Sequence, residues 1–254
     1  MSEKPVLLVT GGASGIGQGI ASLFGARGYS VVIADINQDA GEVVVQQLRQ
    51  QGHDTVFVKV DVRDQASVQH LLQTVGEQFS RLDCLCNNAG IERYRSAEDY
   101  TLEEFNSITE TNLRGAFLCT QSAFTLLKTA KGNIVTIASI QGIATERNIS
   151  VYAATKAGLL GWTRAVALDF AQYGIRANAV CPGAIDTGML TAALANDPDP
   201  KSTIAAMNKS IPLQRIGRPE DVAEAVYFLA SPAAAYITGA SITVDGGLLA
   251  RHAL

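Results

Sequence analysis

Short apolar segments alternate with helix-length segments along almost all of this 254-residue chain. Runs rich in Val and Ile predict strands at 5–10, 29–35, 55–60, 82–87, 133–138, 175–181 and 241–244. The stretches between them predict helices at 15–27, 38–51, 65–79, 101–127, 151–170 and 220–229. Apolar strands that alternate with helices form parallel sheets covered on both faces. We therefore expect an α/β fold: a single doubly wound parallel sheet of about seven strands with helices on both faces.

Charge and apolar content exclude several classes of protein. Hydrophobic residues make up 47% of the chain, too many for intrinsic disorder. The net charge is −4 and no run of basic residues is present, so we expect no nucleic-acid partner. No stretch approaches the ~20 apolar residues of a membrane-spanning helix, and the run 6–9 is too short for a signal peptide. We expect a cytoplasmic protein with no membrane partner.

The cysteines and histidines do not fit a metal site or a triad hydrolase. Cys84 and Cys86 do not have zinc-ligand spacing, and no second cysteine or histidine pair completes a site. No Gly-x-Ser-x-Gly segment accompanies the histidines, as a Ser-His-Asp hydrolase would require. We predict that the protein binds no metal and that its cysteines are buried, reduced and purely structural.

A glycine-rich turn, Thr-Gly-Gly-Ala-Ser-Gly-Ile-Gly at 10–17, joins the first strand to the first helix. Glycines let the backbone turn tightly and approach a pyrophosphate, which then lies at the helix N-terminus. The spacing differs from plain G-x-G-x-x-G, but the strand–turn–helix context is the one required. We favour a Rossmann-type dinucleotide site over a glycine-rich loop without a ligand. The candidate contacts in the turn are Gly11, Ser14, Gly15, Ile16 and Gly17.

Asp35 ends the second strand and indicates which dinucleotide binds. A carboxylate at this place can accept hydrogen bonds from both hydroxyls of the adenosine ribose and would repel a 2′-phosphate. Ile36 and Asn37 follow it, and neither they nor the glycine turn supply a basic residue to balance such a phosphate. These residues favour NAD over NADP; a turn or cap residue is the alternative for Asp35.

Tyr152 and Lys156 are spaced i, i+4, so they lie on one face of a predicted helix. A phenol with a pKa near ~10 is a poor base at neutral pH, and a neighbouring ammonium stabilises the phenolate and lowers that pKa. The pair therefore suits general acid/base chemistry. Taken alone, the spacing favours an ordinary pair on a helix surface.

The motifs together resemble the classical short-chain dehydrogenases/reductases. The glycine turn, Asn87-Asn88-Ala89-Gly90, Asn112, Ser139, Tyr152-x-x-x-Lys156 and Pro182-Gly183 follow the order of that family from about Pro5 to Gly247. The resemblance implies that Tyr152 is the general acid/base and that Lys156 lowers its pKa and binds the nicotinamide ribose. It implies that Ser139 polarises the substrate carbonyl and that Asn112 holds a water in a proton relay to Lys156.

The resemblance also implies further cofactor contacts and an assembly. The implied contacts, besides Tyr152, Lys156 and the residues of the glycine turn and Asp35, are Ile36, Asp61, Val62, Asn88, Ala89, Gly90, Pro182, Gly183, Ile185 and Thr187. Relatives of this kind are commonly tetramers, so we expect a homotetramer. We expect residues 1–254 to form a single dinucleotide-binding and catalytic domain, because no linker or internal repeat interrupts the pattern.

The substrate site is the least constrained part of the sequence. An irregular, proline-containing segment at 187–218 is predicted to cover the substrate, since long excursions inside compact domains are often lids. The candidate substrate contacts are Glu92, Gln141, Asn148 and Met189. The run Asn-Asn-Ala-Gly-Ile-Glu at 87–92 resembles sugar dehydrogenases of the family, in which this glutamate lies near the sugar. A solvated loop glutamate is the alternative.

These observations predict an NAD(H)-dependent oxidoreductase that acts on a small molecule. It would interconvert a secondary alcohol and a ketone, or a sugar lactol and a lactone, with a sugar, polyol or similar hydroxylated substrate. A 3-oxoacyl-thioester reductase is one alternative, which Asp35 disfavours because such enzymes usually prefer NADPH. A non-catalytic dinucleotide sensor is the other, and the intact Asn112, Ser139, Tyr152 and Lys156 set disfavours it.

Overall fold

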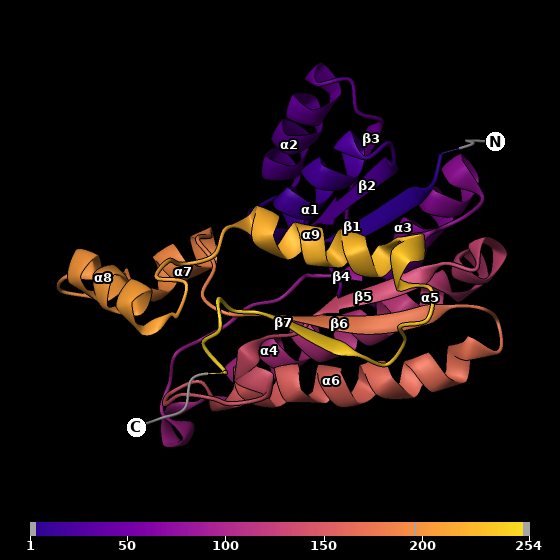
Figure 1. The fold of residues 1–254 in the computed structure, drawn as a ribbon. Coiled ribbons are helices and arrows are strands. Elements are labelled where there is room, and N and C mark those ends of the chain that lie inside the picture. Colours follow the sequence, from indigo (N-terminus) through magenta and orange to yellow (C-terminus); the bar gives the residue numbers. More distant parts are fainter. Residues whose placement is uncertain (1–3, 196, 251–254) are drawn as a thin grey trace.

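Seven strands form one parallel sheet, in the order β3-β2-β1-β4-β5-β6-β7, in a computed structural model that describes residues 4–195 and 197–250 (Figure 1). The strands are β1 (Val6–Thr10), β2 (Ser30–Asp35), β3 (Thr55–Lys59), β4 (Cys84–Asn87), β5 (Asn133–Ile137), β6 (Arg176–Pro182) and β7 (Ser241–Val244). All six neighbouring pairs are parallel. The predicted fold class, a doubly wound parallel α/β sheet, is confirmed.

Helices cover both faces of the sheet and bury two hydrophobic cores. One face packs against α1 (Gly15–Ala26), α2 (Gln38–Gln50) and α9 (Pro219–Ala230). The other packs against α3 (Gln65–Phe79), α5 (Gly115–Ala130) and α6 (Ser150–Ala171). The pleat of β1 explains the division, because Leu7 and Val9 enter the first core while Val6 and Leu8 enter the second. Among the described residues, no helix is long and apolar enough to span a membrane.

The strand order reverses between β1 and β4, and this reversal positions the site. From β1 the chain moves outward through β2 and β3, and it then returns to place β4 on the other side of β1, with Leu7 opposite Cys84. Ligands of open α/β sheets bind beyond the carboxyl ends of the strands at such a reversal. The glycine turn follows β1 and the Asn87–Gly90 segment follows β4, so the two meet at this point. The four cysteines are buried and free.

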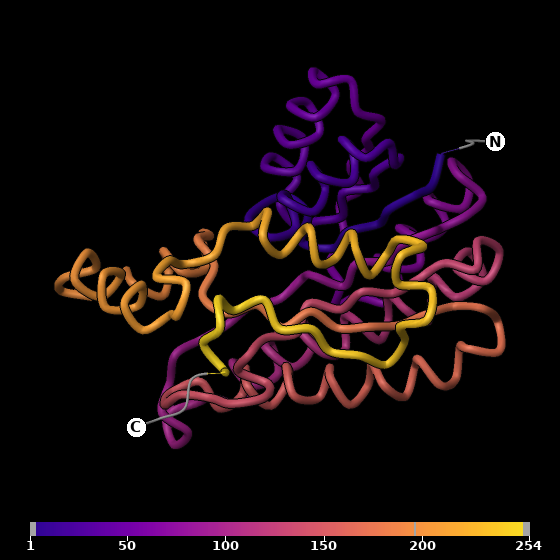
Figure 2. Tube along the Cα trace, in the orientation of Figure 1, coloured from indigo at the N-terminus to yellow at the C-terminus, as the bar shows by residue number. Residues whose placement is uncertain are grey.

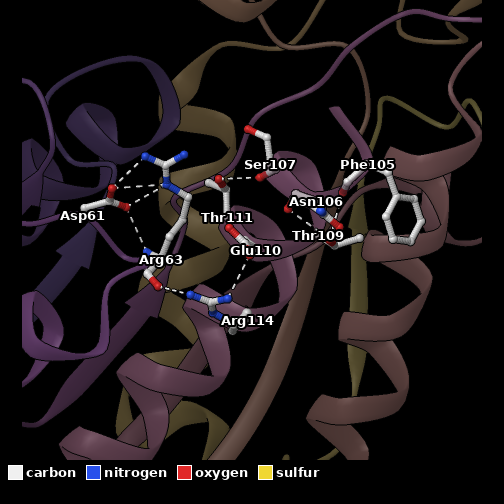
Figure 3. A network of polar contacts seen from close by, with 9 residues as sticks. All are labelled: Asp61, Arg63, Phe105, Asn106, Ser107, Thr109, Glu110, Thr111 and Arg114. Atoms are coloured by element: carbon white, nitrogen blue, oxygen red, sulfur yellow. Dashed lines mark hydrogen bonds and ion pairs between the residues drawn. The ribbon is translucent and has the colours of Figure 1, made fainter. Parts of the chain in front are cut away.

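The helix predicted over 101–127 is divided by a π-helical turn. The structure has α4 (Leu102–Thr109), the wider turn Glu110–Arg114, and then α5. Hydroxyl groups compete with the helix ladder here: Thr109 donates to the carbonyl oxygen of Phe105 (2.8 Å) and Thr111 to that of Ser107 (2.8 Å), as Figure 3 shows. The turn directs Asn112 inward, where it is 1% exposed. Sequence periodicity alone does not reveal one extra residue in a turn.

The segment predicted as irregular at 187–218 contains two helices. They are α7 (Gly188–Ala193) and α8 (Pro200–Ser210), and they project from the body of the molecule on one side (Figure 1). Figure 2 follows the segment from the end of β6 out to this projection and back to α9. Proline does not break α8, because Pro200 occupies the first turn and Asp199 caps the helix by accepting from the backbone N–H of Ser202 (3.1 Å).

Candidate active site

A cleft of about 630 Å³ runs along the carboxyl edge of the sheet. This volume is within the ~300–1,000 Å³ typical of ligand clefts. The sequence-predicted residues that line it are Gly11, Ser14, Gly15, Ile16, Asp35, Ile36, Asp61, Val62, Asn88, Ala89, Gly90, Glu92, Ser139, Gln141, Tyr152, Lys156, Pro182, Gly183, Ile185, Thr187 and Met189. Three predicted residues do not line it: Gly17, Asn112 and Asn148.

The glycine turn forms a cradle in one wall of the cleft. Gly11 has φ +63, and a Cβ on it would lie 3.0 Å from the Cα of Ala89. Gly17 lies behind the turn, where a Cβ would lie 2.1 Å from the carbonyl oxygen of Gly11. Asn88 holds the turn from β4, since its Nδ2 donates to the carbonyl oxygens of Thr10 (2.9 Å) and Gly11 (3.0 Å). The turn is thus packed too tightly for a side chain at Gly11 or Gly17, and it lies at the N-terminus of α1, where a pyrophosphate would bind. The residues present therefore fit a dinucleotide.

The carboxylate of Asp35 is held in place at the end of β2. Its Oδ2 accepts from the backbone N–H of Ala13 (3.0 Å) and its Oδ1 from that of Asn37 (2.9 Å). Each oxygen keeps a lone pair for another donor, such as a ribose hydroxyl. Among the described residues that line the cleft, the basic side chains are Lys156 and Arg63, and Arg63 is paired with a neighbouring carboxylate.

Ser139, Tyr152 and Lys156 meet where β5 and α6 approach the cleft. Ser139 follows β5, and its hydroxyl accepts from the backbone N–H of Gln141 (3.1 Å). Tyr152 and Lys156 lie one turn apart on α6 and are 7% and 3% exposed. The Nζ of Lys156 lies 5.4 Å from the centroid of the Tyr152 ring and donates to the carbonyl oxygen of Ile137 (2.7 Å). The i, i+4 pair is therefore buried, and it is not the ordinary surface pair that the spacing also allowed.

Burial governs the protonation of these groups. It raises the pKa of Tyr152, and Glu92 raises it further, whereas a hydrogen bond with Ser139 lowers it. Burial lowers the pKa of Lys156 to about 8, opposed by Cys181 and Glu92. We expected Lys156 to lower the pKa of Tyr152; in this structure the pKa of Tyr152 is raised, and burial is the largest cause. Tyr152 is protonated at neutral pH and is therefore ready to donate.

Asn112 lies behind the cleft and joins two elements of the site. Its Oδ1 accepts from the backbone N–H of Ile91 (2.8 Å), and its Nδ2 donates to the carbonyl oxygen of Ile91 (2.9 Å) and to Oγ1 of Thr155 (3.1 Å). Thr155 is the neighbour of Lys156 on α6. The side chain thus fixes the segment after β4 against α6, and its part in a proton relay stays a prediction.

Three of the four predicted substrate contacts lie in the cleft. Glu92, Gln141 and Met189 line it. Asn148 does not, because it lies on the exposed outer side of its loop in a left-handed conformation (φ +65). Its carbonyl oxygen accepts from the backbone N–H of Arg95 (2.7 Å), which holds the loop in this orientation.

Tyr94 and Glu146 also line the cleft, and neither was predicted from the sequence. The Tyr94 hydroxyl and the Gln141 Nε2 each donate to Oε1 of Glu146, both at 3.0 Å. Burial, and after it the neighbouring Glu146, raise the pKa of Glu92 to about 7 against an opposing effect of Lys156. Two carboxyl groups therefore share this space. The only sequence signal for Tyr94 and Glu146 was their position in loops that follow β4 and β5. Three other lining residues with polar side chains were not predicted either: Arg63, Ser107 and Thr111.

Comparison with known proteins gives the family. A family model described as enoyl-(acyl carrier protein) reductase matches residues 11–249. A cis-4-hydroxycyclohexanecarboxylate dehydrogenase from Sinomonas cyclohexanicum is 40% identical, over 96% of this chain and 96% of that protein. The chain belongs to the short-chain dehydrogenase/reductase family.

Other short-chain dehydrogenases/reductases match over nearly the full chain. A 3-oxoacyl-[acyl-carrier-protein] reductase from Synechocystis sp. is 39% identical, over 96% of each chain. The solved structure of an aldohexose dehydrogenase from Thermoplasma acidophilum has a TM-score of 0.90 at 34% identity, covering 99% of this chain and 96% of that one. Dehydrogenases of this family use nicotinamide dinucleotides, so the chain is an oxidoreductase of that kind.

Proposed function

We propose that this protein is an NAD(H)-dependent dehydrogenase that interconverts a secondary alcohol and a ketone, or a sugar lactol and its lactone. The observation that carries the proposal is the buried Tyr152–Lys156 pair, which faces the cleft beside Ser139. The bound nicotinamide supplies the hydride chemistry. The protein moves the proton that must accompany the hydride, and Tyr152 is the group placed to do so.

The three side chains divide the work at the substrate oxygen. Tyr152 donates its proton to that oxygen when a carbonyl is reduced and takes the proton back when an alcohol is oxidised. The Ser139 hydroxyl donates a hydrogen bond that stabilises negative charge developing on the same oxygen. Lys156 is buried and carries an ammonium group beside the tyrosine, so it stabilises the phenolate that forms as the proton leaves.

Asp35 supports the preference for NAD. Its carboxylate is oriented by two backbone N–H groups and keeps lone pairs for the two ribose hydroxyls. A 2′-phosphate at the same place would meet this fixed negative charge. Besides Lys156, the basic side chain among the described residues that line the cleft is Arg63, and it is paired with Asp61.

The substrate proposed is a sugar, polyol or similar hydroxylated compound. Glu92, Gln141 and Glu146 supply hydrogen-bonding groups where the substrate would extend from Tyr152. The names of the two dehydrogenase relatives above, for a hydroxycyclohexane acid and an aldohexose, agree with a hydroxylated ring. The name of the Synechocystis relative favours a 3-oxoacyl-thioester reductase as the second candidate, against which Asp35 argues. A non-catalytic dinucleotide sensor would have no use for the buried pair.

The organisation of the chain is part of the proposal. We propose one domain over residues 1–254, with 187–218 covering the substrate; Met189, Leu190 and Met207 of this segment line the cleft. We also propose a cytoplasmic homotetramer. The exposed apolar side chains of Leu102, Phe105, Phe117 and Leu168 on α4, α5 and α6 support an assembly in which these helices pack together.

The test is NADH formation across a panel of aldoses, polyols, hydroxysteroids and simple secondary alcohols, with NAD and NADP in parallel. We expect turnover of a sugar or polyol with NAD. Tyr152→Phe should abolish turnover and leave NADH binding, measured by fluorescence, nearly unchanged, and Tyr173→Phe, outside the cleft, should retain both. Turnover only with NADPH and a 3-oxoacyl thioester would favour the second candidate. Tight NADH binding without turnover of any substrate would favour the sensor.

A further inference from the structure

The loops that follow β4 and β5 are tied together beside the cleft. The backbone N–H of Arg95 donates to the carbonyl oxygen of Asn148 (2.7 Å), and Arg95 forms an isolated parallel bridge with Ile149. The Tyr94 hydroxyl joins the same two loops by donating to Oε1 of Glu146 (3.0 Å). These contacts hold Glu146 at the wall of the cleft, so its position does not depend on a ligand.

The carboxylate of Glu146 is oriented through one of its two oxygens. Oε1 accepts from the hydroxyl of Tyr94 and from Nε2 of Gln141, both at 3.0 Å. In return, the backbone N–H of Glu146 donates to Oε1 of Gln141 (3.2 Å), so the two residues are joined by a reciprocal pair of hydrogen bonds. Within the described residues, no donor reaches Oε2 of Glu146. That oxygen is therefore available to a hydrogen-bond donor on a ligand.

Glu92 supplies a second carboxyl group to the same part of the cleft. It is half-buried, and its backbone carbonyl oxygen, not its side chain, accepts a hydrogen bond from Nη1 of Arg93 (2.9 Å). Glu146 helps to raise the pKa of Glu92, which shows that the two carboxyl groups repel each other, while Lys156 opposes this effect. In the part of the chain that the structure describes, no basic side chain forms an ion pair with Glu92 or Glu146. The two groups thus offer acceptors and negative charge without a paired cation.

This arrangement favours some ligands of the cleft and disfavours others. The buried side chains of Tyr152 and Lys156 line the same cleft, and so do the apolar side chains of Met189, Met207 and Leu248. A carboxylate or phosphate there would leave water and meet two groups of like charge, and such repulsion is a common means of rejecting a wrong partner. A hydroxyl or ammonium group would instead donate to the carboxylates. The chemistry of the site therefore distinguishes ligands by charge.

We propose that Glu146 is a specificity-determining residue and that, together with Glu92, it selects a substrate whose far end carries a hydroxyl or ammonium group and rejects one that carries a carboxylate or phosphate. The far end is the part of the substrate that extends away from the carbon beside Tyr152. The proposal rests on the proposed function, because it narrows the substrate class of the same cleft. The shared property of the accepted groups is that they donate hydrogen bonds and bear no negative charge.

The test compares three ring alcohols that differ in the group across the ring: cyclohexane-1,4-diol, 4-aminocyclohexanol and 4-hydroxycyclohexanecarboxylate. Their dissociation constants are measured by ligand-observed NMR on the protein–NADH complex at pH 8, where Glu92 is ionised. An alcohol does not react with NADH, so the affinities are independent of turnover. The carboxylate should bind about tenfold more weakly than the diol, and the amine at least as tightly as the diol. Equal affinities, or binding of none of the three compounds, would overturn the proposal.

Variants of Glu146 assign the effect to its charge. Glu146→Gln should reduce the ratio of the carboxylate and diol dissociation constants about threefold, because one of the two charges is removed. Glu146→Asp keeps the charge and should keep most of the ratio. Glu103→Gln is the matched control, since Glu103 is exposed on α4 and does not line the cleft. An equal change of the ratio in Glu103→Gln, or no change in Glu146→Gln, would overturn the proposal; thermal unfolding checks that each variant is folded.

The same measurements separate this proposal from the proposed function. A protein–NADH complex that discriminates among the three compounds, while no compound of the substrate panel is turned over, would contradict the proposed function and not the role of Glu146. Turnover of a polyol with NAD, together with equal affinities for the three compounds, would support the proposed function and overturn the role of Glu146.

Discussion

Asn112 and Ile91 are joined by a reciprocal pair of hydrogen bonds in which the side-chain amide of Asn112 satisfies both the backbone N–H and the carbonyl of Ile91. A strand partner would make the same two bonds, but here they come from one side chain in the π-helical turn. The second amide hydrogen reaches Thr155, next to Lys156. One residue thus sets how the segment carrying Glu92 lies relative to the proposed proton-transfer groups.

Asn112→Ala should lower both stability and turnover. It leaves the half-buried N–H and carbonyl groups of Ile91 without these partners, so we expect a loss of about 2–3 kcal/mol in the free energy of unfolding. Because the Lys156 region and the Ile91 segment lose a shared anchor, kcat should fall by on the order of 10²-fold. Urea unfolding and steady-state kinetics measure the two effects. Asn106→Ala, exposed on α4, is the control, and a similar loss there would refute a specific role for Asn112.

Gly17→Ala should disrupt the glycine turn. The added Cβ would lie 2.1 Å from the carbonyl oxygen of Gly11 and 2.6 Å from Nδ2 of Asn88, so the turn must shift. We expect a loss of about 1–3 kcal/mol of stability and of most NADH binding. Gly76→Ala in α3 is the control, since its Cβ would lie 3.7 Å from Leu126 in a helix, where alanine is favoured. Normal NADH binding by Gly17→Ala would show that the turn is not the pyrophosphate cradle.

Asp35→Ala should weaken NAD more than NADP. The change removes the acceptors for the two ribose hydroxyls and also the negative charge that repels a 2′-phosphate. The hydrogen bonds from the backbone N–H groups of Ala13 and Asn37 to Asp35 are lost as well, which should weaken the binding of both cofactors to a similar extent. The measured quantity is the ratio of the two dissociation constants, in which a general effect cancels. An unchanged ratio would remove the ribose assignment.

The ionisation of Glu92 should lower the free energy of unfolding as the pH rises from about 4.5 to about 7. Its pKa is raised from 4.5 to about 7 in the folded protein, first by burial and then by Glu146. Between these values the native state binds more protons than the unfolded state, and the free energy of unfolding therefore decreases with rising pH. Glu92→Gln should gain stability relative to the wild type across this window, and Glu146→Gln should narrow the window. Urea unfolding at pH 5 and pH 7.5 tests this; a constant difference between wild type and Glu92→Gln would contradict it.

The strand–helix alternation, the glycine turn and the Tyr152–Lys156 spacing were readable from the sequence because each depends on residues close together in the chain. Apolar periodicity identified every strand of the sheet, and parallel strands then had to bring their carboxyl ends to one edge. That is why residues as distant as Gly11 and Thr187 were predicted in one cleft and lie in it.

Tertiary structure alone decided what depends on burial and on contacts between distant segments. The packing of α6 decides that Tyr152 and Lys156 form a buried pair and not a surface pair. The same burial raises the pKa of Tyr152. The meeting of Arg63 with Arg114 and of Tyr94 with Glu146 joins segments that no local pattern links. The sequence established which groups are present at the site, and the packing of the helices on the sheet determined their surroundings, because desolvation and long-range contacts exist only after folding.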